Sequence, residues 1–241
     1  MKTSFLGLLQ WSLIRHKQVL PLFSILQILL SLAMVYGLAL VIYDLDDVSV
    51  VYLSTGAIVM GIIAVGCVLC AQVVSESRQN GVFEYQRSLP VSRMSILMSD
   101  ILIWGVASAP GIIASFFASV LRFQVGITIT PIGILFVLLS LTTMICIGFT
   151  IAYYLKPNVV GMVTQLIMIS CLLFSPITFP ASRLPEWTNI IYSVLPFVPV
   201  ANLIRYSFFG IGELSYPNVA IVFAWCIACI SLSLRALSKR N

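Results

Sequence analysis

The amino-acid sequence predicts an all-α membrane protein with six transmembrane helices. Of its 241 residues, 60% are hydrophobic and only 9% are charged, whereas soluble domains carry about 25% charged residues. The apolar residues are gathered in runs of roughly 20, which is the length that crosses the hydrocarbon core of a bilayer as a helix. The few charged residues cluster between these runs, a pattern that orients a membrane protein.

Six apolar segments are long enough to cross a membrane. They are residues 19–43, 50–74, 94–121, 131–155, 159–179 and 217–234. The third segment contains Pro110, which can kink a helix because proline lacks a backbone N–H. The same segment carries a small residue at every fourth position, which favours close helix packing either within the chain or across a dimer. These residues are Ala107, Gly111, Ser115 and Ser119.

The basic residues predict the orientation of the chain in the membrane. With a cytoplasmic N-terminus, ten of the 13 Lys and Arg residues fall on the cytoplasmic side, and only Arg122, Arg183 and Arg205 fall outside. Because basic loops favour the cytoplasm, we expect both termini to be cytoplasmic. The basic residues that orient the chain in the membrane account for its net charge of +5. The charge therefore does not indicate nucleic acid as a partner.

Residues 1–18 are predicted to form an amphipathic helix on the cytoplasmic membrane surface. Phe5, Leu8, Leu9 and Leu13 recur at helical spacing and precede the basic run at residues 15–17. An apolar face beside a basic cluster is typical of a helix that lies in the lipid interface. Residues 19–241 then form a single six-helix domain.

The outer connection, residues 175–216, is predicted to be a re-entrant helical segment. Six of the chain's 11 prolines lie in it or at its edge, namely Pro176, Pro180, Pro185, Pro196, Pro199 and Pro217. Between two of these stops, apolar residues recur at i, i+3, i+4, i+7 and i+8, which is the pattern of a short amphipathic helix. They are Trp187, Ile190, Ile191, Val194 and Leu195. We expect this helix to dip into the outer leaflet.

The sequence contains no recognisable catalytic machinery. It has no G-x-x-x-x-G-K-[ST] phosphate loop, and its one histidine, His16, lies in the basic cluster near the membrane surface. The six cysteines lie inside apolar runs, where the spacings Cys67/Cys70 and Cys226/Cys229 are those of small hydrophobic residues one turn apart. We therefore expect no catalytic residue, no metal site and no cofactor in this chain.

Asp100 is the one acidic residue that falls inside an apolar run. It lies about six residues into the third run, or roughly 9 Å along a helix, so it can still reach the interface. A pairing with Arg93 or Lys156 is one interpretation, and a role in gating or substrate binding is the other.

The cytoplasmic loop, residues 75–93, is the most charged part of the chain. Phe83 and Tyr85 stand between charged residues, which favours a helix that docks on a partner over a solvated turn with interfacial aromatics. Gly81 allows a turn before this helix, and Leu89-Pro90 is expected to end it.

At this loop the sequence resembles the permease subunits of ABC-2 type exporters. The shared order is an acid, a glycine, a hydrophobe followed by Glu, and Leu-Pro-x-x-Arg, here Glu76, Gly81, Phe83, Glu84, Leu89, Pro90 and Arg93. The outer segment is similar as well, with Ser175-Pro-Ile-Thr-Phe-Pro180, Leu184-Pro-Glu-Trp187, Leu195-Pro196 and Ala201-Asn-Leu-Ile-Arg205. The resemblance covers essentially the whole chain.

The resemblance implies a permease that works with separate ATP-binding subunits, which hold ATP and Mg. Two permeases would form a homodimer or heterodimer in the bacterial plasma membrane, in contact with lipid. ATP-driven movement would reach the membrane through the loop residues named above together with Arg87, with Phe83 inserted in a groove of the ATPase. The outer segment would help gate the path, with Pro176, Pro180, Pro185, Trp187, Pro196 and Arg205 as its candidate residues.

Two other function classes remain open from the residues alone. A secondary transporter or channel would work without an ATPase and would need charges or broken helices at mid-membrane depth, for which Asp100 is the candidate. A structural or enzymatic membrane subunit would show neither an ATPase partner nor flux. The substrate class expected from the weakly polar spans is an amphipathic or hydrophobic molecule that is moved outward.

Overall fold

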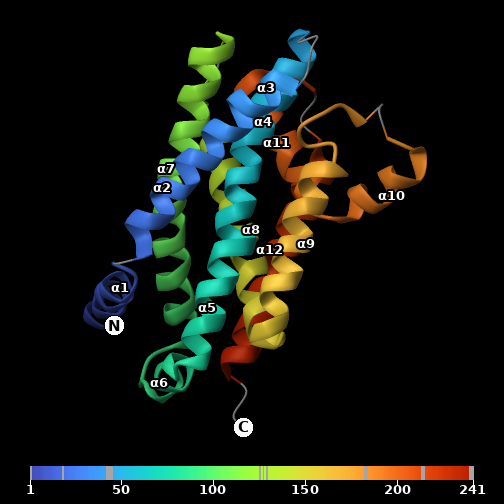
Figure 1. Cartoon of the computed structure of the whole chain (residues 1–241). Coiled ribbons are helices and arrows are strands. Elements are labelled where there is room, and N and C mark those ends of the chain that lie inside the picture. The colour runs from blue at the N-terminus through green and yellow to red at the C-terminus, as the bar shows by residue number, and fades with distance from the viewer. Residues whose placement is uncertain are drawn as a thin grey trace.

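The computed structural model describes residues 2–17, 19–41, 46–124, 126, 128, 130–181, 184–212 and 215–238, and omits a few further side chains, among them that of Arg87. Within these residues the chain is helical and contains no β-strand (Figure 1). The all-α class is therefore confirmed. Arg183, whose placement outside the membrane was expected, lies outside the described residues.

Five of the described helices are long and apolar enough to cross a membrane. They are α2 (Val19–Leu32) continued by the π-helical turn η1 (Ala33–Gly37), the continuous helix formed by α4 (Asp47–Ile63), η2 (Ala64–Leu69) and α5 (Cys70–Gln79), α7 (Arg93–Phe123), α8 (Pro131–Tyr154) and α12 (Tyr216–Ser238). The short α3 (Leu38–Val41) follows η1. Each of the five spans overlaps most of one apolar segment identified in the sequence.

The segment at residues 159–179 forms a shorter helix than expected. It is α9 (Pro157–Leu173), with 17 residues, and the chain leaves the helix at Phe174. Pro176 follows two residues later, and proline disfavours a helical conformation in the residue before it. The structure therefore gives five helices of spanning length among the described residues and does not confirm the count of six.

The second span extends five residues further into the cytoplasmic loop than its apolar run predicted. Arg78, in the last turn of α5, donates from Nη1 to three carbonyl oxygens at the end of α8, those of Ala152 (3.0 Å), Tyr153 (2.8 Å) and Leu155 (3.3 Å). A guanidinium at a helix C-terminus satisfies carbonyls that have no partner within the helix. This contact holds α5 helical beyond the apolar stretch.

Polar side chains from α2 satisfy the backbone of α7 around its internal proline. Gln27 donates from Nε2 to the carbonyl of Ala107 (3.1 Å), and its Oε1 accepts from the N–H of Gly111 (3.2 Å). Ser31 donates to the carbonyl of Gly111 (2.9 Å). Such partners are needed in lipid, where water does not replace a lost helix bond. The stripe of small residues on α7 thus packs within the chain, against α2 and α4.

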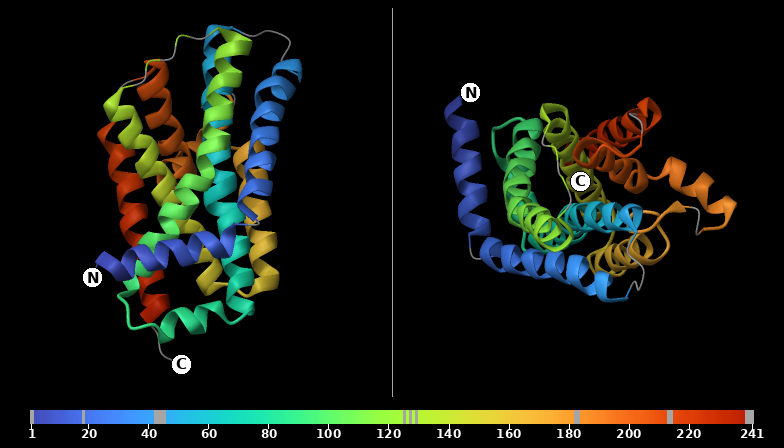
Figure 2. Two further views of the ribbon diagram at one scale, coloured as in Figure 1. Left: turned by 90° about the vertical axis from the view of Figure 1, so that its left-hand side faces the viewer. Right: turned by 90° about the horizontal axis from the view of Figure 1, so that it is seen from above.

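The elements that lie outside the spans gather at the two ends of the bundle. At one end, α1 (Lys2–His16) and α6 (Val82–Ser88) run across the bundle, near where α12 also ends (Figure 2). In the opposite half lie α11 (Phe197–Phe209) and the short α10 (Glu186–Val194) (Figure 1). By the basic-residue rule the first end is the one expected to face the cytoplasm.

Candidate functional site

The turn before α6 depends on Gly81. This residue has a left-handed backbone with φ of 74°, a conformation that glycine adopts without a steric penalty. Its N–H donates to the carbonyl of Arg78 at 3.4 Å, and its own carbonyl accepts from the N–H of Tyr85 at 3.2 Å. The helix ends at Ser88, and Leu89 is extended before Pro90. The predicted start and end of the loop helix are both confirmed.

Phe83 faces the membrane domain rather than the outside of the molecule. Its side chain is 8% exposed, and its ring centroid lies 5.2 Å from that of Tyr153 on α8. The expectation that Phe83 inserts into a groove of an ATPase is therefore wrong, because the ring already fills a site in its own chain. The amphipathic pattern of the loop located the docking helix but did not show which face was already covered.

Gln86, also on the inner face of α6, contacts the buried Asp100 of α7. Its Nε2 donates to Oδ2 of Asp100 at 3.4 Å, and the side chains are 5% and 4% exposed. Arg93 donates from Nη1 to the backbone carbonyl of Gln86 at 3.2 Å. Thus α6 is tied to the beginning of α7 at two points, and a displacement of α6 acts directly on that span.

Asp100 also holds α1 against α7. Ser12 donates its hydroxyl to Oδ1 at 2.7 Å, and Arg15 forms an ion pair with the same oxygen at 3.3 Å. Neither Arg93 nor Lys156 is the partner in this structure, so the expected pairing is corrected to Arg15. Asp100 of α7 is therefore the shared acceptor of side chains from two other elements, α1 and α6. A buried carboxylate needs such donors, because an unpaired charge in an apolar surrounding is very costly.

The face with which α1 contacts the bundle is partly polar. Leu8, Ser12 and His16 are buried at successive helical turns, whereas Leu13 is 48% exposed. The predicted apolar face therefore agrees with the buried face only at Leu8. The exposed apolar residues of α1, including Leu6 and Ile14 at 58% and 71%, are free to contact lipid.

The surroundings of His16 disfavour the charged form of its ring. Its Nδ1–H donates to the carbonyl of Ser12 at 2.8 Å, and its ring meets the edge of Trp104 with 5.5 Å between centroids. Burial lowers the pKa of His16 below its ordinary value of 6.5, and the Arg15 charge lowers it further. The hydrogen bond to Ser12 and the charge of Asp100 act in the opposite direction but do not reverse the shift.

The outward surface of the loop is polar and aromatic. Glu76, Glu84 and Tyr85 are exposed, the last at 54%. The ring of Tyr85 lies 5.8 Å from that of Trp11, so the surface continues from α6 onto α1. This continuous face, composed of α6, the end of α5 and part of α1, is available to a cytoplasmic partner.

On the outer side, Arg205 joins the proline-rich segment to α4. Its guanidinium lies 3.7 Å from the ring centroid of Tyr52, which is a cation–π contact. It donates to Oδ1 of Asn202 (2.8 Å) and to the carbonyl of Ile177 (3.1 Å), and the residue is 4% exposed. Arg205 therefore connects α11, α4 and the loop that follows α9.

The other outer candidates are divided between buried and exposed positions. Pro176 and Pro196 are buried, Pro180 is half-buried and Pro185 is exposed. Pro185 and Pro196 directly precede α10 and α11, where proline can begin a helix without losing a needed N–H. Trp187 is 64% exposed on α10. Among these six residues, Arg205 makes the described polar contacts with several elements, and Pro196 lines an apolar cavity.

Sequence reasoning missed four residues that join these elements: Ser12, Gln86, Arg78 and Tyr52. Serine and glutamine in a loop or surface helix carry no signal of their partners. Arg78 did carry one, since a basic residue that directly follows an apolar span can cap a neighbouring helix.

A family comparison agrees with this arrangement. The model of the ABC-2 type transporter family matches residues 3–209, which include nearly all of α1, the loop at residues 75–93, most of the outer segment and α11. None of the curated proteins compared with the chain matches it. The matched region covers most of the sequence, and the family is one of membrane transport subunits rather than catalytic domains. The chain therefore belongs to the ABC-2 type transporter family.

Proposed function

We propose that this chain is the permease subunit of an ATP-binding-cassette exporter, and that a separate ATP-binding subunit docks on its α6 face. The observation that carries the proposal is the construction of α6. Its inner face is tied to α7 through Gln86 and Asp100, while Glu84 and Tyr85 on its outer face remain exposed. A helix of this kind can receive a movement on one side and pass it to a span on the other.

The energy source would lie on the partner, which would bind ATP and Mg. Closure of the ATP-binding subunits would push α6, and the bonds of Gln86 and Arg93 would carry this displacement to α7. Because Asp100 also holds Ser12 and Arg15, α1 would move with the same unit. Loop residues such as Glu76 and Glu84 would form the polar contacts with the ATPase.

The proposed topology has six spans, with both termini in the cytoplasm of a bacterial plasma membrane. The sixth crossing would be made by α9, whose 17 residues extend about 26 Å at 1.5 Å per residue. This length approaches the hydrocarbon thickness of about 30 Å. The end of α12 and the helices α1 and α6 lie at one end of the bundle, as an even number of crossings requires (Figure 2).

The proposed cargo is an amphipathic or hydrophobic molecule that moves outward between two permease protomers. An unpaired polar group costs several kcal/mol in hydrocarbon, so a polar cargo would need dedicated partners in the spans. The proline-rich outer segment, held to α4 by Arg205, would open or close the outer end of the path.

A secondary transporter or channel is the alternative. Among the described side chains of the spans, Asp100 is the buried carboxylate that such a mechanism would use, but it is already bonded to Ser12, Arg15 and Gln86. This occupied state favours a structural and coupling role over ion binding.

The proposal is tested by co-purification and reconstitution with the cognate ATP-binding subunit. Replacing Glu84 and Tyr85 by alanine should reduce co-purification of the ATPase and abolish ATP-dependent transfer of fluorescent lipid-like probes. The matched control is Ser88→Ala, which removes an exposed hydroxyl that bonds only locally to the carbonyl of Tyr85. Probe movement that follows an ion gradient without ATP would instead support the alternative.

A further inference from the structure

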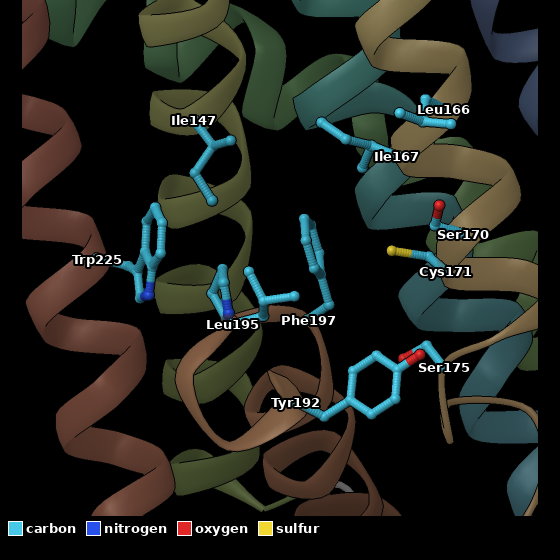
Figure 3. A pocket seen from close by; sticks show the side chains of 11 residues that line it. Ile147, Leu166, Ile167, Ser170, Cys171, Ser175, Tyr192, Leu195, Phe197 and Trp225 are labelled. Atoms are coloured by element: carbon cyan, nitrogen blue, oxygen red, sulfur yellow. The ribbon is translucent and has the colours of Figure 1, made fainter. Parts of the chain in front are cut away.

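An apolar cavity of about 310 Å³ lies on the side of the bundle that carries α9 and α12. Ile147 of α8 and Trp225 of α12 border one side, Ile167 and Cys171 of α9 border the other, and Leu195 and Phe197 lie between them (Figure 3). In the bundle, α12 packs along α8, whereas α9 packs mainly against α5. The cavity is the space that remains between α9 and α12.

The aromatic side chains of the lining turn their polar ends away from the cavity. Trp225 donates from Nε1 to the carbonyl of Val194 at 2.9 Å, and the Tyr192 hydroxyl donates to the carbonyl of Phe174. Their rings therefore present hydrocarbon to the interior. No residue that lines the cavity is charged, and the serines at 170 and 175 are its other polar side chains. The cavity thus suits a hydrocarbon and not a charged or strongly polar group.

The cavity opens toward exposed apolar faces of α9 and α12. Leu166, which lines it, is 66% exposed, and Ile169 and Leu173 on α9 are 50% and 59% exposed. Phe223 and Ile227 on α12 are exposed at 55% and 50%. An acyl chain that lies against α9 in the bilayer therefore has a continuous apolar route into the cavity.

We propose that this cavity binds an acyl chain of a bilayer phospholipid. Water gains too few hydrogen bonds in a cavity of this lining. A chain of methylene groups is narrow enough to enter, and lipid is the solvent on that side of the helices.

Occupation of the cavity would support the outer segment. Tyr192 and Val194 belong to α10, and their hydrogen bonds join this helix to the end of α9 and to α12 across the cavity. An acyl chain beneath these two contacts would fill the space under α10 and hold it in the observed position. This site is independent of the proposed ATPase partner.

The test is photo-crosslinking of the full chain in lipid nanodiscs that contain a phospholipid with a diazirine at the end of one acyl chain. Labelling, mapped by mass spectrometry, should concentrate on residues 166–171, 195–197 and 225. Ile167→Trp, which fills the cavity, should reduce this labelling several-fold. Ile169→Trp, on the exposed face of the same helix, should leave it unchanged, and Leu195→Trp provides a second filling variant.

Three outcomes would overturn the proposal. Labelling spread evenly over the exposed faces of α9 and α12 would indicate ordinary bilayer contact only. Loss of the labelling on addition of excess rhodamine 6G, at constant phospholipid, would make the cavity a cargo site. A disulfide between two copies carrying Leu166→Cys, in a background without the native cysteines, would place a second protomer there.

Discussion

At the scale of single residues, the cytoplasmic site is decided by which side chains are buried. Phe83 and Tyr85 are both aromatic and lie two positions apart on α6, yet the first is 8% exposed and the second 54%. Gln86 and Glu84 differ in burial in the same way. Gln86 is buried and bonds to Asp100, whereas Glu84 is exposed. Side chains on the inner face stabilise the chain itself, and those on the outer face are available to a partner.

Phe83→Ala should destabilise the isolated chain. Removal of a buried Phe side chain typically costs about 3–5 kcal/mol, and a site at the edge of the core should fall at the low end. Tyr85→Ala should change stability little, since its ring is half exposed. The measurement is thermal unfolding of the purified chain in detergent without any ATPase. Equal stability of the two variants would contradict the burial of Phe83.

His16 should make the chain less stable as the pH falls. Its pKa is lowered in the folded state, mainly by burial, so below the ordinary value of 6.5 the unfolded chain binds a proton that the folded chain resists. Stability from this group is fully present above that pH and is lost as the pH falls through the folded-state pKa.

Thermal unfolding between pH 7.5 and pH 5 measures this effect. His16→Gln, which can still donate to the carbonyl of Ser12, should flatten the pH dependence. If the wild-type and variant profiles fall in parallel, other groups are responsible and the prediction fails.

At the scale of elements, α1 and α6 form one unit through a carboxylate of α7. Ser12 and Arg15 come from α1 and Gln86 comes from α6, and all three donate to Asp100. Hydrogen bonds to a charged group are worth about 1.5–3 kcal/mol each, more than a neutral pair contributes. The two surface helices should therefore move together rather than independently.

Asp100→Asn should release α1 from the bundle. The amide keeps an acceptor for Ser12 but removes the charge that pairs with Arg15, so faster backbone hydrogen exchange is expected in α1. Exchange in α9, which does not contact Asp100, serves as the internal control. The matched variant Ser99→Ala removes a neighbouring buried hydroxyl that bonds only within α7, and protection of α1 should be retained there.

At the scale of the whole molecule, the elements at the two ends of the helix bundle predict which segments face each side of the membrane. Val48, at the start of the long helix that begins with α4, is 45% exposed. Glu84 lies on α6, just after the turn at the other end of this helix, and is also exposed. Single cysteines at these two positions, in a background without the native cysteines, should react from opposite sides with a membrane-impermeant thiol reagent. Labelling of both from outside intact cells would contradict the proposed topology.

The sequence by itself determined the all-α class, the approximate positions of the spans and the limits of α6. These depend on local properties: apolar length, the left-handed backbone of Gly81, and the extended Leu89 before Pro90. The family was also recognisable, because its motifs are runs of neighbouring residues in a fixed order. None of these inferences required knowledge of which helices touch.

Only the tertiary structure decided the partners of the buried polar groups. Asp100 pairs with Arg15 across 85 positions, Arg205 lies over Tyr52, and Phe83 packs on Tyr153 instead of remaining exposed. The apolar cavity beneath α10 likewise exists only because α9 and α12 pack on different helices. Helical periodicity shows that a side chain lies on a given face, but the energy of a contact depends on which distant helix the fold places opposite that face.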